Sequence, residues 1–137
     1  MCGILLYLDK KNSLEKKISI LKKASKLLIH RGPDYNKSII KNNIYLFHSR
    51  LSIQDLNKRS NQPMIKNYKK EKFYTSYNGE IYNFRKIKKK LSKKFKFNTN
   101  SDTEVLINNF LSHEQKPNFI MDFKGMFAFV ILNSSKK

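Results

Sequence analysis

The sequence predicts a layered fold of the α/β (α+β) class, in which helices cover sheets that are apolar on both faces. Three observations support this prediction. Short runs at 3–8, 44–48 and 125–132 are apolar at nearly every consecutive position, as in strands buried on both sides. Amphipathic helical patterns alternate with these runs along the chain. The chain has 137 residues, which is the usual size of one domain with a single core.

A strand and a helix are predicted before the first turn signal. The run GILLYL at 3–8 is too short for a stable helix and predicts a strand buried on both faces. Ser13 is a good N-cap, and the apolar residues after it recur at steps of four, three, three and four: Leu14, Ile18, Leu21, Ala24 and Leu28. This spacing predicts one amphipathic helix, which Gly32 and Pro33 end.

Two further strands are predicted in the middle of the chain. Both faces of the first are mostly apolar, with Ile44, Leu46 and His48 on one face and Tyr45 and Phe47 on the other. The segment FYTSY at 73–77 has the aromatic and Thr content of a strand. We expect this strand to stop at Asn78-Gly79, because Asn-Gly is a strong signal of a tight hairpin turn.

Two more helices and a last strand follow. A helix with a lysine-rich exposed face is predicted from the spacing of Ile81, Phe84, Ile87, Leu91 and Phe95. Ser101 and Glu104 have the spacing of a capping box at the start of a second short helix. The run GMFAFVIL at 125–132 predicts a buried strand. We expect that strand to lack a pairing partner, because so few residues follow it.

The net charge of +19 is the strongest compositional feature, and it raises the question of nucleic acid as a partner. Only four of the 29 basic residues are Arg, whereas planar recognition of phosphates and bases favours Arg. Asn and Ile are abundant and Ala occurs only twice, a pattern that codon bias in an AT-rich coding sequence produces. The composition therefore favours codon bias over a role in nucleic-acid binding.

Cysteine usage and the absence of long apolar runs predict a cytoplasmic protein. The single cysteine, Cys2, excludes an internal disulfide, and the first residues lack the pattern of a secretory signal. No apolar run approaches the length needed to cross a bilayer, which is about 18 residues. We therefore expect a reducing compartment and no membrane partner.

The position of Cys2 suggests a nucleophile. Methionine excision normally follows when the second residue is small, so the mature chain is expected to begin with Cys2. One residue then carries a thiol and a free α-amine that can take the thiol proton near neutral pH. Gly3 leaves the approach to the thiol open. On spacing alone, Cys2 fits a small buried apolar residue at the start of a strand equally well.

Seven motifs occur in order along the chain: MCGI, HRGPD, HSRLSIQDL, NQPM, YNGEIYNF, SDTEVL and KGMFAF. They resemble landmark motifs of the class II glutamine amidotransferase domain of glutamine-hydrolysing asparagine synthetases. The resemblance covers residues 2–137. It implies the N-terminal nucleophile hydrolase fold, a four-layer sandwich of two antiparallel sheets between helices, which here is truncated at its C-terminus.

The resemblance implies that glutamine is the substrate and assigns roles to the site residues. Cys2 would attack the side-chain amide, while Asn78 and Gly79 donate N–H groups to the oxyanion. Arg50 would bind the α-carboxylate and Asp102 the α-ammonium. The other pocket residues would be Leu51, Ser52, Ile53, Gln54 and Glu80.

Simpler interpretations of some of these residues exist. Asn78-Gly79 by itself also fits a plain hairpin turn, and Asp102 fits an acidic first-turn residue that interacts with the helix dipole. A thiol–imidazole pair of Cys2 with His48 is a rival mechanism. The covalently attached amine is already in place, so we favour the amine as the base.

The resemblance implies neither a metal nor a cofactor for this domain. ATP and magnesium belong to a synthetase domain, absent from this chain, that would activate aspartate and accept the ammonia. The expected partners are glutamine, such a synthetase domain or subunit, and a second copy of the chain in a homodimer as in the family. We therefore expect a fragment, a split subunit or a truncated gene product of an asparagine synthase. The alternatives are a relative with a sugar or peptide acceptor, an inactive remnant, or a basic nucleic-acid-binding module.

Overall fold

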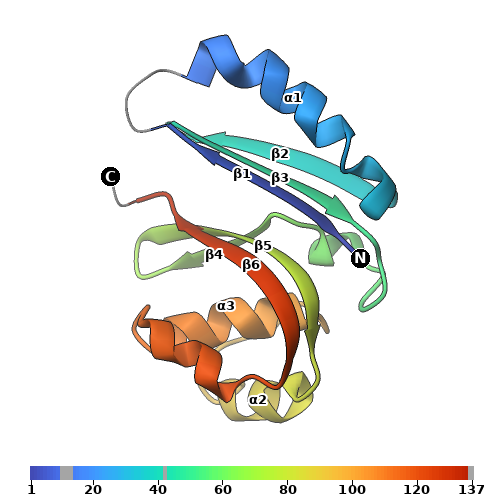
Figure 1. The fold of residues 1–137 in the computed structure, drawn as a ribbon. Coiled ribbons are helices and arrows are strands. Elements are labelled where there is room, and N and C mark those ends of the chain that lie inside the picture. The colour runs from blue at the N-terminus through green and yellow to red at the C-terminus, as the bar shows by residue number, and fades with distance from the viewer. Residues whose placement is uncertain (10–13, 42, 136–137) are drawn as a thin grey trace.

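The computed structural model describes residues 1–9, 14–41 and 43–135 and shows four layers (Figure 1). The strands are β1 (Gly3–Leu8), β2 (Tyr35–Lys41), β3 (Ile44–Arg50), β4 (Met64–Tyr68), β5 (Glu71–Ile81) and β6 (Gly125–Asn133). The α-helices are α1 (Ile18–Lys26), α2 (Phe84–Leu91) and α3 (Asp102–Ser112). Short 3₁₀ turns are η1 (Leu14–Lys17), η2 (Ile29–Arg31), η3 (Lys58–Ser60) and η4 (Pro117–Asp122). The predicted layered sandwich of two antiparallel sheets between helices is confirmed.

The first sheet has the strand order β1-β3-β2 and is antiparallel throughout. Its outer face packs under α1, where Leu21 meets Tyr45 and Phe47 in a small apolar core. The predicted first helix is present, although it begins with the 3₁₀ turn η1 before α1. Its predicted N-cap, Ser13, lies outside the described residues.

The prediction that the 3–8 strand is buried on both faces is wrong. Leu5 and Tyr7 contact the α1 core, but Leu6 and Leu8, on the opposite face, are 43% and 50% exposed. These two leucines lie on an edge strand, because β1 pairs only with β3 within the described sheet. The second sheet, which faces them, leaves them partly open.

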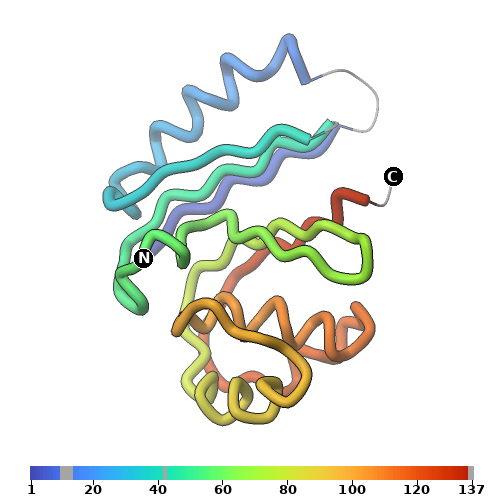
Figure 2. Tube along the Cα trace, turned by 180° about the vertical axis from the view of Figure 1, so that it is seen from behind, coloured from blue at the N-terminus to red at the C-terminus, as the bar shows by residue number. Residues whose placement is uncertain are grey.

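The second sheet has the order β4-β5-β6, and α2 and α3 cover its outer face (Figures 1 and 2). The core between helices and sheet includes Tyr77 and Ile81 from β5 and Val105 and Leu106 from α3. The prediction that the last strand lacks a partner is wrong, because β6 pairs with β5 from Ile81↔Gly125 to Phe73↔Asn133. As an edge strand, β6 is also half-exposed rather than buried.

The predicted turn at Asn78-Gly79 is also wrong. β5 continues through both residues to Ile81, and Asn78 and Gly79 pair with Ala128 and Phe127 of β6. Gly79 has φ +143°, and a Cβ there would lie 2.1 Å from the Met126 carbonyl oxygen. The glycine therefore permits a close approach of two strands instead of a reversal of the chain.

The predicted capping box at the start of α3 is only half present. The Ser101 hydroxyl accepts the backbone N–H of Thr103, as an N-cap should. Glu104 does not reach back to Ser101. Its carboxylate instead accepts the N–H groups of Asn98 and Thr99 and contacts the Lys66 ammonium. These contacts to the Lys66 ammonium and to the two N–H groups of the preceding loop replace the contact to Ser101 that a capping box would have.

Two strands, β2 and β4, were not expected from the sequence. Most β2 side chains are exposed, and its residues YNKSIIK lack a clear alternation of apolar and polar positions. Within the described part of the chain, no helix is long and apolar enough to cross a membrane.

Candidate active site

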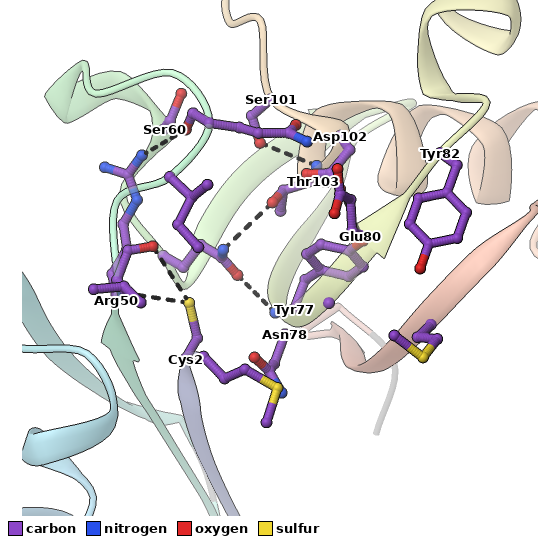
Figure 3. Close-up of a pocket in the computed structure, with 17 residues that line it drawn as sticks. Cys2, Arg50, Ser60, Tyr77, Asn78, Glu80, Tyr82, Ser101, Asp102 and Thr103 are labelled. Atoms are coloured by element: carbon purple, nitrogen blue, oxygen red, sulfur yellow. Dashed lines mark hydrogen bonds between the residues drawn. The ribbon is translucent and has the colours of Figure 1, made fainter.

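A cavity of about 280 Å³ opens where the start of β1, the end of β3, the end of β5 and the start of α3 meet (Figure 3). Nine of the ten predicted site residues line it: Cys2, Arg50, Leu51, Ile53, Gln54, Asn78, Gly79, Glu80 and Asp102. Ser52 is the exception. Its backbone N–H donates to the Asp34 carboxylate at 2.6 Å.

Cys2 is held at the head of β1 by hydrogen bonds to the end of β3. The Leu51 N–H donates to the Cys2 sulfur at 3.4 Å, and the thiol faces the Leu51 carbonyl at 3.8 Å. The Arg31 Nε donates to the Cys2 carbonyl, and the Gly3 N–H donates to the Ser49 hydroxyl. Chain ends usually fray, but hydrogen bonds to three residues hold this one in place.

Asn78 and Gly79 reach the cavity from the end of β5. Cys2 lies on one side of the cavity and Asn78, on β5, borders it from another (Figure 3). Because Gly79 is fixed in a β5–β6 pair and cannot carry a side chain, its backbone is both open to the cavity and held in place. Fixed donors of this kind are what an oxyanion requires.

Arg50 is buried at the end of β3, and the loop that follows surrounds its guanidinium. Nη1 donates to the Asn57 carbonyl and the Asn61 side-chain oxygen, and Nη2 donates to the carbonyls of Gln54 and Asp55. These four bonds use all four N–H groups of the two terminal nitrogens. To bind a carboxylate through two nitrogens, Arg50 would have to use its Nε and one terminal nitrogen. That terminal nitrogen would have to release or share one of its present acceptors.

Asp102 lies across the cavity at the first position of α3. One carboxylate oxygen accepts the Tyr77 hydroxyl at 2.8 Å and the Ile81 N–H at 3.1 Å. Burial raises the pKa of Asp102 above the usual carboxyl range, and these hydrogen bonds oppose that shift. Burial and the neighbouring acid also raise the pKa of Tyr77, so the tyrosine keeps its proton and donates it.

Several lining residues lie outside the set that the sequence predicts. Gln62 joins two elements: its side-chain oxygen accepts the Tyr77 N–H at 2.6 Å, and its amide donates to the Thr103 hydroxyl at 3.3 Å. Further residues of the lining are Met1, Ser60, Tyr77, Tyr82, Ser101, Thr103 and Met126. Gln62, Tyr77 and Thr103 lie inside the NQPM, YNGEIYNF and SDTEVL motifs, and that position is the signal that could have found them.

The rival pairing of Cys2 with His48 finds no support. His48 is 0% exposed, and neither ring nitrogen has a hydrogen-bond partner within the described residues. Burial, aided by the Arg50 charge, lowers the pKa of His48 to about 4. The imidazole is therefore neutral at pH 7 and is not among the residues that line the cavity.

Two stacked antiparallel sheets between helices, with a cysteine at the head of the first strand, define an N-terminal nucleophile amidotransferase fold. The solved structure of glutamine phosphoribosylpyrophosphate amidotransferase from B. subtilis shares it, with a TM-score of 0.59 over 69% of this chain and 22% of that one. The identity of 24% makes this a likeness of fold alone.

The chain belongs to the class II glutamine amidotransferase family, since the family model described as "Glutamine amidotransferase domain" matches residues 1–137. Asparagine synthetase B [glutamine-hydrolyzing] of Escherichia coli is 37% identical over 99% of this chain and 24% of its own length. Asparagine synthetase [glutamine-hydrolyzing] 2 of rice (Oryza sativa subsp. japonica) is 40% identical over 100% of this chain and 22% of its own. The chain thus spans about a quarter of the curated relatives it matches.

Proposed function

We propose that this chain hydrolyses glutamine to glutamate and ammonia through a thioester on Cys2. The observation that carries the proposal is the shared cavity, which is lined by Cys2, Asn78, Gly79, Arg50 and Asp102. A nucleophile, two oxyanion donors and two opposite charges at fixed places match a zwitterionic amino acid that ends in a carboxamide.

The reaction uses the chain's own groups. The Cys2 thiolate attacks the side-chain carbonyl carbon of glutamine, and Asn78 Nδ2 and the Gly79 N–H stabilise the oxyanion. The α-amine of Cys2 passes a proton to the departing nitrogen, so that ammonia leaves as the thioester forms. Water then attacks the thioester, which releases glutamate and restores the thiol.

The amino-acid end of glutamine lies between opposite charges in this proposal. The Arg50 guanidinium attracts the α-carboxylate, and the Asp102 carboxylate attracts the α-ammonium. Both groups are buried, so their attraction is screened less than between exposed charges. Glu80 and the backbone around Leu51, Ile53 and Gln54 complete the cavity wall.

Met1 must be removed for this chemistry. Met1 lines the same cavity as Cys2, so its excision frees the α-amine and also clears space for glutamine. Mass spectrometry of the purified chain should show Cys2 at the N-terminus. A chain that retains Met1 and still hydrolyses glutamine would contradict the role of the α-amine.

The experiment that tests the proposed function compares the wild-type chain with Cys2→Ala. We expect glutamate release from glutamine by the wild type and none above background from the variant. Glutamine should still raise the thermal midpoint of Cys2→Ala, because Arg50 and Asp102 remain. Equal glutamate release by both proteins would overturn the proposal.

We further propose that the ammonia is used by a synthetase domain or subunit that makes asparagine from aspartate with ATP and magnesium. The support is the sequence identity of this chain to glutamine-hydrolysing asparagine synthetases over its whole length. The acceptor identity is testable: adding a candidate synthetase subunit with aspartate and ATP should yield asparagine from glutamine nitrogen. If the acceptor is instead a sugar or a peptide, this assay should yield no asparagine, while glutamine hydrolysis stays intact.

A further inference from the structure

Asp55 is a largely buried acid that the proposed reaction does not use. It lies in the loop between β3 and η3, and its side chain is only 7% exposed. Its φ is +47°, in the left-handed region that residues other than glycine seldom adopt. Asp and Asn enter this region more readily than most residues. A buried charge in a sparsely populated conformation persists only where its surroundings hold it.

On one side, Asp55 holds the loop around Arg50. The Asp55 carbonyl accepts the Arg50 Nη2 at 2.6 Å, and its Oδ1 accepts the Asn57 N–H at 3.2 Å. Little apolar packing helps this loop, because Ile53 and Leu56 are both exposed. The position of the loop therefore depends on hydrogen bonds.

On the other side, Asp55 reaches the start of α3. Its Oδ2 accepts the Asn100 N–H at 2.7 Å, and Asn100 directly precedes Ser101 and Asp102. Burial alone would raise the pKa of Asp55, but the Asn100 N–H and the other donors around it lower the pKa overall. The acid is thus ionised at neutral pH. A charge-assisted hydrogen bond of this length is stronger than a neutral one.

We propose that Asp55 is a positioning residue that ties the Arg50 loop to the start of α3 and so sets Arg50 relative to Asp102. This inference rests on the proposed function, because those two residues are the ones assigned to the charged end of glutamine. Asp55 is not among the cavity-lining residues and acts through its neighbours. Its loss should weaken the grip on the amino-acid end and spare the chemistry at the Cys2 sulfur.

The test is Asp55→Asn, which keeps the size of the side chain and tolerates the same φ. An amide cannot accept both N–H groups that the carboxylate accepts. We expect the KM for glutamine to rise about 10-fold, as for the loss of one charge-assisted hydrogen bond, while kcat stays within about 2-fold. An unchanged KM, or a fall in kcat alone, would overturn the proposal.

Two reagents separate a positioning role from a general disturbance of the site. A glutamine analogue with a diazoketone in place of the amide needs the amino-acid end to be bound before it alkylates Cys2. Iodoacetamide has no such end. In Asp55→Asn the first alkylation should slow about 10-fold and the second should not change. Equal slowing of both would show a structural defect and count against the proposal.

Glu114→Gln is the matched control. Glu114 is also an acid at positive φ, at +55°, but its side chain is 79% exposed and pairs with Lys116 at 3.1 Å. We expect KM, kcat and both alkylation rates to match the wild type. Asp55→Gly is the second variant, because glycine allows the same backbone and removes the whole side chain. Loss of folding in both Asp55 variants would count against a positioning role.

Hydrogen exchange at the Asn100 amide distinguishes failure of this inference from failure of the proposed function. The amide should exchange slowly in the wild type and faster in Asp55→Asn, whether or not glutamine is hydrolysed. A wild-type chain that releases no glutamate contradicts the proposed function and, with it, this role for Asp55. An active wild type in which Asp55→Asn changes neither exchange nor KM contradicts the positioning role alone.

Discussion

The two walls of the cavity are built in different ways. One wall is formed by the end of β5 and the start of α3, and its positions follow from strand pairing and the helix–sheet core. The other is formed by the end of β3 and the following loop, where the guanidinium of Arg50 is surrounded by carbonyls. The sheet wall therefore depends mainly on backbone geometry, whereas the loop wall depends on polar side chains. Substitutions in the two walls should therefore impair activity and stability in different ways.

The largest effect is expected at Gly79, on the sheet wall. Gly79→Ala places a methyl group 2.1 Å from the Met126 carbonyl oxygen at a φ of +143°. The β5–β6 pair must shift, which misplaces an oxyanion donor, and we expect kcat to fall about 10²–10³-fold. Glutamate release and the thermal midpoint should both drop. Normal activity in this variant would show that the sheet wall is not as rigid as its register suggests.

Asp102→Asn sharpens the comparison by removing a charge from the sheet wall without changing its shape. The loss of the partner for the α-ammonium should cost about 3 kcal/mol in kcat/KM, or roughly 100-fold. The raised pKa of Asp102 means that burial penalises its ionised form, so the variant should be at least as stable as wild type at pH 7. That relative gain should disappear as the pH falls below the usual carboxyl pKa. A variant that loses stability at pH 7 would contradict this sign.

His48→Leu tests β3, the strand that leads into the loop wall. Since burial lowers the pKa of His48 to about 4, the unfolded chain binds a proton below its ordinary pKa and the folded chain does not. The wild type should thus lose about 2 kcal/mol of stability through this residue between pH 7 and pH 5. Denaturant unfolding of wild type and variant at both pH values measures the difference. An identical pH dependence would exclude this assignment.

The smallest effect is expected from Tyr77→Phe. The Tyr77 hydroxyl donates to Asp102, so its removal leaves the carboxylate with fewer donors and should raise the KM for glutamine about 5-fold to 10-fold. The rate of Cys2 alkylation by iodoacetamide should stay at the wild-type value. A fall in kcat with constant KM would place Tyr77 in the chemistry and not in the support of Asp102.

Two patterns predicted most of the elements: apolar residues that repeat on one face indicated the helices, and short runs of consecutive apolar or aromatic residues indicated the strands. The helices α1, α2 and α3 and the strands β1, β3, β5 and β6 all overlap the predicted segments, although Ile81, expected in the second helix, ends β5, and Phe95 lies beyond the end of α2. The edge strands β2 and β4 were not predicted, because many of their residues are exposed and do not form an apolar pattern. Asn-Gly predicts a turn at 78–79, but a sequence does not show which strand will pack against a glycine, and here the close contact with β6 requires one.

The motifs placed nine of ten proposed site residues at one cavity, but the support around them was not visible in the sequence. Among the described residues, three of the four hydrogen bonds from the terminal nitrogens of Arg50 run to backbone carbonyls, which every residue possesses, so the residue types in the sequence do not indicate them. Asp55 is similar, because its carboxylate accepts the N–H group of Asn100, a residue 45 positions away in the chain. Only the folded chain brings such partners together.

The anchoring of the first residues has a practical consequence for recombinant work. Because Arg31, Ser49 and Leu51 hold Cys2 and Gly3 in place, and Met1 lines the cavity, residues added before Cys2 would start at the edge of the proposed glutamine site and would block the α-amine of Cys2. An affinity tag therefore belongs after Lys137, or ahead of a protease site whose cleavage leaves no extra residue. A preparation with an uncleaved leader would be inactive because Cys2 would lack the free α-amine that the proposed reaction needs.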